Sequence, residues 1–158
     1  MKKIYLLRHA KAFKEGLNDF ERDLNEKGKE DIKKMLKKLE KYGLDFDMIV
    51  SSKATRALKT AKKFAQHYNK ELHLEDSFYE ANAKDLFSYI KNLDDSIKSV
   101  LLVGHNPALS ELAELLSDIC INSFPTSSVL GLYFESDSFK NLKEHEAKIL
   151  FFECVKNL

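Results

Sequence analysis

The clearest indication of the fold is in residues Ile4–Phe13, which read IYLLRHAKAF. Its first four residues form an apolar run that is typical of a strand buried on both faces of a parallel sheet. The run stops at Arg8 and His9, so a buried strand ends in two side chains that can carry positive charge. In open α/β sheets, ligands bind at the carboxyl ends of the strands, and this position therefore predicts a binding site.

Segments with strand and helix periodicity alternate along the rest of the chain. Strands are predicted at residues 3–7, 46–50, 71–74, 99–103, 128–134 and 148–155. Helices are predicted to start at the N-caps Asn25, Ser51–Ser52, Asn82 and Asn106, the last with Pro107 at the first helical position. The first helix is expected to end at Gly43. This alternation predicts an α/β fold, a three-layer sandwich with a mostly parallel central sheet flanked by helices, with the last two strands antiparallel at an edge.

Length and composition place bounds on the function. The chain has 158 residues, with 26 Lys and Arg against 25 Asp and Glu, and 44% of its residues are hydrophobic. These values predict a single globular domain over residues 1–158. The balanced charge argues against nucleic acid or an anionic membrane as a partner. No apolar run approaches the ~18 residues of a membrane span, and the run near the N-terminus is too short for a signal peptide, so we expect a cytoplasmic protein.

The cysteines and three of the histidines are expected to have no chemical role. Cys120 and Cys154 are too few for a disulfide scaffold, and neither has metal-ligand spacing to another Cys or His. We expect both thiols to be buried and reduced. His67, His73 and His145 lie in polar contexts and are expected on the surface.

Three predicted strands end in similar polar sequences. Arg8 and His9 follow the first, Ser51–Ser52 follow the second with Arg56 one helical turn later, and His105 follows a third. If these strands are parallel, their ends lie at one edge of the sheet, where two arginines, two histidines and two helix N-termini converge. Guanidinium groups and the N–H groups at a helix start both favour phosphate oxygens. The sequence therefore predicts a phosphate-like ligand.

The convergent histidines suggest the chemistry. A histidine can attack phosphorus with one ring nitrogen while the other donates to a backbone carbonyl that fixes the tautomer. The sequence lacks a Cys in a phosphate-cradling loop, a G-x-x-x-x-G-K-[ST] motif and an acidic cluster for paired Mg²⁺. Metal-free transfer through a phosphohistidine, without a cofactor, fits these observations. Two alternatives stay open: structural roles for the separate residues, and a metal site at His9 and His105, for which no third ligand is obvious.

Five motifs carry a resemblance that spans nearly the whole chain. In order they are R-H-A at 8–10, R-D-L-N-E-K-G at 22–28, S-S-x-A-x-R-A-x-x-T-A at 51–61, Y-E-A at 79–81 and V-G-H-N-P at 103–107. The ordered set resembles the histidine phosphatase superfamily, whose fold is phosphoglycerate mutase-like. The small size, the absence of a long insertion and F-P-T at 124–126 resemble its SixA-type branch, the protein phosphohistidine phosphatases.

The resemblance implies a role for each matching residue. His9 is expected to be the phosphorylated nucleophile. Arg8, Arg56 and His105 are expected to bind the phosphoryl oxygens, and His105 also to stabilise the transition state. Arg22 is expected to border the pocket as a further phosphate-binding residue.

Other residues in these motifs have two open interpretations. Glu80 is either the general acid that protonates the leaving group, or a surface carboxylate or ion-pair partner of an active-site arginine. Asn25, Ser52 and Asn106 are sufficiently explained as residues that start helices. The segment 117–128 is a candidate for the rim of the pocket.

The resemblance implies a phosphatase that acts through a covalent phosphohistidine intermediate. The expected substrate is phosphohistidine on a signalling or phosphotransfer protein, because a short chain without a large cap leaves an open pocket. The alternatives are a phosphatase for a small phosphomonoester from the same superfamily, and a non-enzymatic phosphate-binding module.

Overall fold

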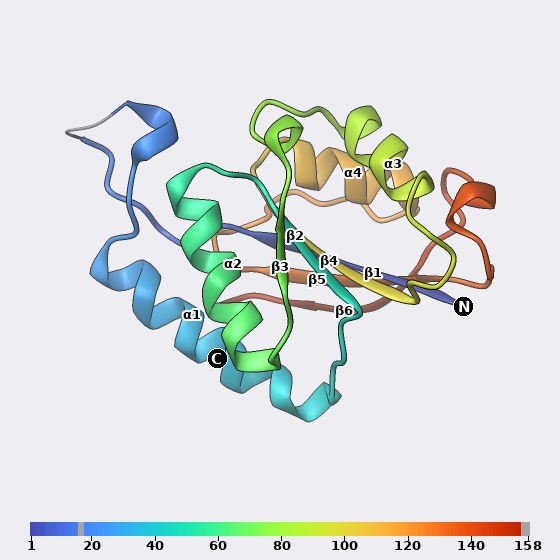
Figure 1. Ribbon diagram of the computed structural model, residues 1–158, viewed down its shortest axis with the longest axis horizontal. Helices are drawn as coiled ribbons and strands as arrows, with labels where there is room; N and C mark the ends of the chain where they lie inside the picture. Colours follow the sequence, from blue (N-terminus) through green and yellow to red (C-terminus); the bar gives the residue numbers. More distant parts are fainter. Residues whose placement is uncertain (16–17, 156–158) are drawn as a thin grey trace.

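The computed structural model describes residues 1–15 and 18–155, which form a twisted sheet between two layers of helices (Figure 1). The strands are β1 (Lys2–Arg8), β2 (Met48–Ser51), β3 (Leu72–Leu74), β4 (Ser99–Gly104), β5 (Val129–Phe134) and β6 (Lys148–Glu153). Their order in the sheet is β3-β2-β4-β1-β5-β6. The first four in this order are parallel, and β5 and β6 are antiparallel at one edge. The predicted mostly parallel sheet with an antiparallel edge is confirmed.

Two pairs of helices cover the two faces of the sheet. The helices are α1 (Glu26–Leu39), α2 (Thr55–Tyr68), α3 (Ala83–Lys91) and α4 (Ala108–Leu116). Four short 3₁₀ helices are η1 (Asp19–Glu21), η2 (Glu40–Tyr42), η3 (Asp76–Phe78) and η4 (Phe139–Asn141). Figure 1 shows α1 and α2 on one side of the sheet and α3 and α4 on the other. This arrangement is the predicted three-layer sandwich.

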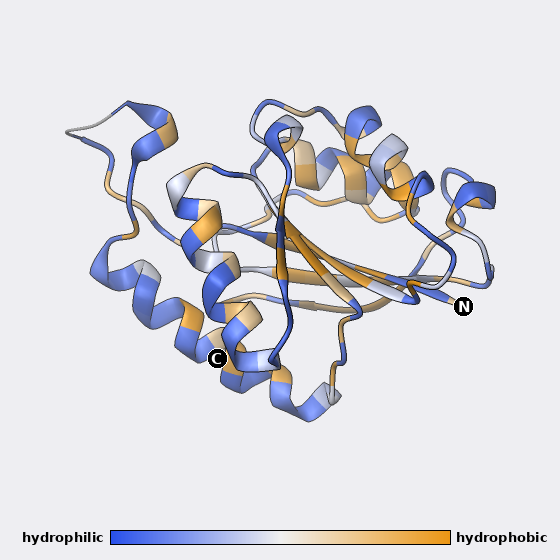
Figure 2. Ribbon diagram, viewed as in Figure 1, coloured by the Kyte–Doolittle hydropathy of each residue, from blue (hydrophilic) through white to orange (hydrophobic). Residues whose placement is uncertain are grey.

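The central strand β1 joins the two halves of the core. Ile4 and Leu6 pack in the cluster that contains α3 and α4, whereas Tyr5 and Leu7 pack in the cluster that contains α1 and α2. Successive side chains of a strand point to opposite faces, so an uninterrupted apolar run is required where both faces are covered. Figure 2 shows the hydrophobic strands between helices whose outer faces are hydrophilic. The polar end of β1 is consequently where this strand can meet a ligand.

Two predicted helix starts are confirmed in detail. The Asn25 side chain accepts a hydrogen bond from the Gly28 N–H at 2.8 Å. Asn82 and Asp85 form a reciprocal capping box, in which each side chain accepts from the backbone N–H of the other. Helix α1 ends at Leu39, earlier than predicted, but the helical run continues through η2 to Gly43, whose φ of 57° is a conformation that favours glycine.

The other two helix starts were predicted wrongly. Helix α2 has Ala54 at its N-cap, not Ser51–Ser52, because Ser51 belongs to β2 and the Ser52 N–H extends the ladder to the Val103 carbonyl at 3.2 Å. Helix α4 has Pro107 at its N-cap, one residue later than predicted. The Asn106 side chain still accepts from the Ser110 N–H at 3.2 Å.

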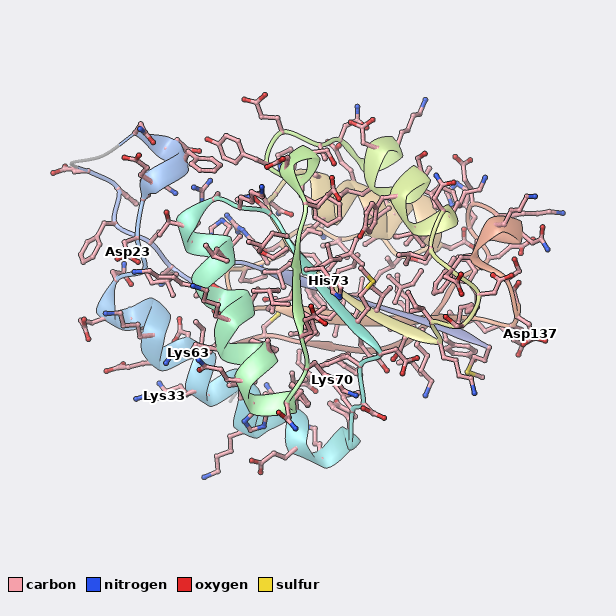
Figure 3. The ribbon with its side chains drawn as sticks, in the orientation of Figure 1. Asp23, Lys33, Lys63, Lys70, His73 and Asp137 are labelled. Atoms are coloured by element: carbon pink, nitrogen blue, oxygen red, sulfur yellow. The ribbon has the colours of Figure 1, made fainter. Side chains whose placement is uncertain are left out.

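The predictions for the cysteines differ in outcome. Cys154 is buried as expected, but Cys120 is exposed because it lies in the loop after α4, outside the packed layers. The surface positions of His67, His73 and His145 are confirmed, and Figure 3 labels His73 on β3. Over the described residues, no helix has the length and apolar character that a membrane crossing requires.

Candidate active site

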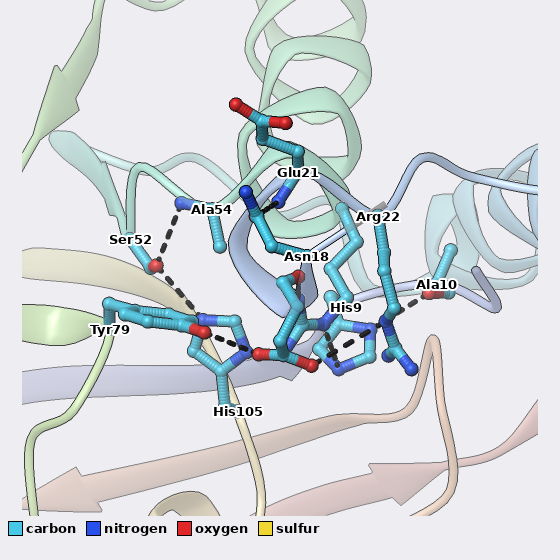
Figure 4. Close-up of polar contacts among 11 residues, drawn as sticks. His9, Ala10, Asn18, Glu21, Arg22, Ser52, Ala54, Tyr79 and His105 are labelled. Carbon is cyan, nitrogen blue, oxygen red and sulfur yellow. Dashed lines mark hydrogen bonds and ion pairs between the residues drawn. The ribbon is translucent and has the colours of Figure 1, made fainter. Parts of the chain in front are cut away.

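The sheet register brings the three polar strand ends together. Arg8 at the end of β1 is paired with Gly104 of β4, and Ser51 of β2 is paired with Val103 of β4. The His9 N–H then donates to the Gly104 carbonyl at 3.1 Å. Because the strands are parallel, the residues that follow them meet at one edge, as the sequence predicted. Figure 4 shows the polar contacts made there.

His9 is held in one tautomer by contacts on both ring nitrogens. Nδ1 lies 2.8 Å from the Ala10 carbonyl oxygen, which can only accept, so Nδ1 carries the proton. Nε2 accepts a hydrogen bond from the Arg56 Nε–H at 3.3 Å. The lone pair of the imidazole is therefore on Nε2, on the side of the ring that faces the arginine.

The surroundings of His9 keep this imidazole neutral. The side chain is buried, and burial lowers the pKa of His9 to about 3, with the nearby charges of His105, Arg56 and Arg8 acting in the same direction. The hydrogen bond to Ala10 opposes the decrease in pKa without reversing it. A neutral imidazole has a lone pair on Nε2 at ordinary pH, and this lone pair can attack phosphorus once the Arg56 Nε–H no longer donates to it.

Arg56 connects His9 to an acidic side chain. Its Nη1–H donates to the Asp19 carbonyl at 2.7 Å, and Nη2 lies 3.2 Å from the Asp19 carboxylate oxygen Oδ2. One turn along α2, Thr60 donates to the Arg56 carbonyl at 2.7 Å and accepts from the Ala10 N–H at 3.0 Å. Thr60 thus ties the first turn of α2 to the loop that follows β1 and sets the position of the guanidinium.

Arg8, at the end of β1, is half-buried. Its Nη1–H donates to the Phe124 carbonyl at 2.9 Å, and its buried Nε has no hydrogen-bond partner among the described residues. Burial lowers the pKa of Arg8, and the positive charge of Arg56 lowers this pKa further. The Ser127 N–H donates to the carbonyls of Arg8 and His9 at 3.0 and 3.2 Å, which attaches the segment before β5 to the site.

His105 faces His9, with 5.3 Å between the ring centroids. Its Nε2 lies 2.9 Å from the Ser52 hydroxyl, and its Nδ1 is buried with no hydrogen-bond partner in the part of the chain that the structure describes. Burial lowers the pKa of His105 to about 4, and Arg56 adds to this effect. Ser52 therefore contacts a site histidine and does not cap α2, which corrects the interpretation from sequence.

Arg22 and Glu80 have different positions relative to this cluster. Arg22 is mostly buried, and its Nε lies 3.6 Å from the Asp19 oxygen Oδ1 (Figure 4). Arg22 shares the Asp19 carboxylate with Arg56, which places Arg22 at the border of the site, and its charge also lowers the pKa of His105. Glu80 is exposed, and among the described residues it forms no hydrogen bond and no ion pair.

Two residues of the site were missed by sequence reasoning, Asp19 and Tyr79. The Tyr79 hydroxyl donates to Asp19 Oδ2, and the Tyr79 ring meets His105 edge-on at 5.6 Å between centroids. The hydrogen bond from Tyr79 is the main reason for the lowered pKa of Asp19, and Arg56 also lowers that pKa. Asp19 lies in an irregular polar segment without any periodicity, so no pattern pointed to it. Tyr79 was visible as part of the Y-E-A motif.

The charges at the site suit a phosphoryl dianion. Three guanidinium groups, from Arg8, Arg22 and Arg56, surround two neutral histidines and one carboxylate, that of Asp19. The site consequently has two positive charges in excess, and a phosphoryl group carries nearly two negative charges at neutral pH. Over the described residues, no three His, Cys, Asp or Glu side chains are grouped as metal ligands.

Comparison with known proteins gives the family. The family model of the histidine phosphatase superfamily (branch 1) matches residues 4–88. The chain therefore belongs to this superfamily. A solved structure assigned as the phosphohistidine phosphatase SixA of Agrobacterium tumefaciens is 28% identical, with a TM-score of 0.83 and 97% of both chains covered. The structure of the protein histidine phosphatase SixA complexed with tungstate has the same fold, with a TM-score of 0.84 at 18% identity over 98% of both chains.

A curated relative is similar over a smaller share of its length. An uncharacterised chloroplastic protein of Arabidopsis thaliana is 29% identical over 133 residues, a match that covers 76% of this chain. The chain spans 61% of the length of that relative. The resemblance to the histidine phosphatase superfamily and to SixA structures that the motifs predicted is confirmed.

Proposed function

We propose that the protein hydrolyses phosphohistidine on another protein through a covalent intermediate on His9. The observation that carries this proposal is the neutral His9 imidazole, whose Nε2 lone pair lies beside the Arg56 guanidinium. The excess positive charge around it is suited to a phosphoryl group. Similarity to SixA structures over nearly the whole chain supports the same substrate class.

The proposed reaction has two steps. In the first, the His9 Nε2 lone pair forms a bond to phosphorus while the substrate N–P bond breaks, and its electron pair stays on the substrate imidazole, which takes up a proton. In the second, a water oxygen attacks phospho-His9, the N–P bond electrons return to Nε2, and phosphate leaves. Arg8, Arg56 and His105 bind the equatorial oxygens in both steps, so catalysis rests on positioning and charge stabilisation. Arg22 adds positive charge at the border.

The carboxylates near the site favour phosphohistidine over a phosphoester as the substrate. A phosphoester needs a protonated group to donate to its leaving oxygen. Hydrogen bonding from Tyr79 and the charge of Arg56 lower the pKa of Asp19, which keeps this carboxyl deprotonated, and Glu80 is exposed without a partner among the described residues. A labile N–P bond depends less on a strong acid. Glu80 stays a candidate acid only for the alternative substrate, a small phosphomonoester.

The test compares phosphate release from a phosphohistidine-bearing phosphotransfer protein and from a panel of small phosphomonoesters. Wild type and His9→Ala are measured with a chelator present. We expect a large kcat/KM advantage for phosphohistidine that His9→Ala abolishes. Preference for one ester would replace the proposal with a small-molecule phosphatase, and binding of phosphate without release from any substrate would indicate a binding module.

A further inference from the structure

A basic cavity of about 690 Å³ lies directly beside Arg8. Its walls come from the end of β1 and the loop after it, from one face of α1, and from the segment before β5, and Val155 after β6 also lines it. The charged residues that line it are Arg8, Lys11, Lys27, Asp31 and Lys34. Only Arg8 is shared with the proposed phosphoryl site, so the cavity is a separate space that adjoins this site.

The local sequence explains why these lysines meet. Lys27, Asp31 and Lys34 are spaced i, i+4 and i+7, which places them on one face of α1. Figure 1 shows that α1 begins on the side of the molecule where β1 ends. The Asn25 N–H donates to the Lys11 carbonyl at 3.1 Å, and a Cβ on Gly28 would lie 2.1 Å from the same oxygen. The glycine thus lets the loop that carries Lys11 close against the start of α1.

The cavity has an excess of positive charge. Asp31 is buried and lies 3.0 Å from the Lys27 ammonium, so these two charges offset each other. Lys11 and Lys34 are exposed, and within residues 1–15 and 18–155 neither forms an ion pair. With Arg8, they leave three positive charges facing a space large enough for several side chains of a partner.

The segment before β5 that lines the cavity is hydrogen-bonded to Arg8, an arginine of the proposed active site. Arg8 donates to the Phe124 carbonyl at 2.9 Å, and Ser123, Pro125 and Thr126 line the cavity next to it. This contact gives part of the segment 117–128 a position at the rim, which sequence reasoning left open. Because Arg8 lines the cavity and also belongs to the proposed phosphoryl site, part of the surface of a substrate bound at His9 would lie next to the lysines.

We propose that this cavity binds acidic side chains that flank the phosphohistidine of a protein substrate. The inference rests on the proposed function and deepens it by naming the chemistry of the substrate surface. Lysine side chains are long and flexible, so each can form an ion pair with a substrate carboxylate that comes within reach while the phosphoryl group is bound. The same charges raise the rate of encounter with an acidic surface, in a manner that salt weakens.

The test uses two peptides that carry one phosphohistidine each. In the first, two Glu residues flank the phosphohistidine on each side, and in the second these are Gln. The quantity measured is the ratio of kcat/KM for the Glu peptide to that for the Gln peptide. The variant Lys11→Gln/Lys34→Gln removes two charges from the cavity. The matched control is Lys33→Gln/Lys63→Gln, which removes the same charge from the groove between α1 and α2 (Figure 3).

We expect wild type and the control variant to prefer the Glu peptide about five- to tenfold, the effect of two exposed ion pairs. The ratio should fall to about one in Lys11→Gln/Lys34→Gln, and in wild type at high salt. In Lys11→Glu/Lys34→Glu, which leaves one negative charge in excess at the cavity, a peptide flanked by Lys should become the better substrate. The inference would be overturned if the control variant lost its preference for the Glu peptide to the same extent, or if Lys11→Gln/Lys34→Gln retained that preference. If wild type hydrolyses both peptides at equal rates, the inference about the cavity is overturned and the proposed function stands. If wild type hydrolyses neither peptide, the proposed function is overturned as well.

Discussion

Replacement of His9 by asparagine is expected to make folding less sensitive to acid. The folded chain holds the His9 imidazole neutral, with its pKa lowered from 6.5 to about 3 by burial. In the unfolded chain the same imidazole is in water and takes up a proton below pH 6.5. Asparagine does not titrate, and its amide nitrogen lies near the place of Nδ1, so it can still donate to the Ala10 carbonyl.

The size of the effect follows from proton linkage. Between pH 6.5 and pH 3, the unfolded chain binds one more proton at this residue than the folded chain, so the stability is complete above pH 6.5 and decreases as the pH falls. Each pH unit in this range costs about 1.4 kcal/mol, and the two units from pH 6.5 to 4.5 cost about 3 kcal/mol. The pKa of His105 is lowered to about 4, so this residue also reduces the stability of the folded chain in acid, and His9→Asn retains that contribution.

Urea unfolding at pH 7 and at pH 4.5 measures this effect without changing the ionic strength. The free energy of unfolding of His9→Asn should decrease about 3 kcal/mol less between the two pH values than that of wild type. His73→Asn, at an exposed position on β3, is the control and should follow wild type. The reasoning is refuted if His9→Asn and wild type lose the same stability on acidification.

Three further substitutions test the site and the fold. Arg56→Lys should lower kcat/KM for the phosphohistidine substrate about 100-fold, because a point charge cannot reach both His9 and Asp19, and turnover near the wild-type rate would contradict the proposed clamp. Gly28→Ala should lower the free energy of unfolding by about 2 kcal/mol in urea titrations, because the new Cβ would lie 2.1 Å from a backbone oxygen. This clash is expected to outweigh the higher helix propensity of alanine. An increase in stability would exclude the close approach. Asn82→Ala should cost about 1 kcal/mol by the same measurement through loss of the capping box, and an unchanged midpoint would show that the cap is dispensable.

Much of the site was predictable because it follows from strand ends. The apolar run that ends at Arg8 predicts a buried strand, and parallel neighbours bring the residues after their carboxyl ends to one edge. Arg56 and His105 were found for this reason. Glu80 was singled out from a motif, but the structure leaves it exposed and places Tyr79, the residue before it, against Asp19 and His105.

The sequence alone determined the features that depend on near neighbours in the chain. These are the strands and the caps at Asn25 and Asn82. Only the tertiary structure decided the pairing of Asp19 with Arg56, the contact of Ser52 with His105, and the basic cavity beside Arg8. Periodicity and capping act over three to four residues, whereas these contacts join segments that are far apart in sequence, and loops without a repeating pattern meet only after the sheet has been assembled.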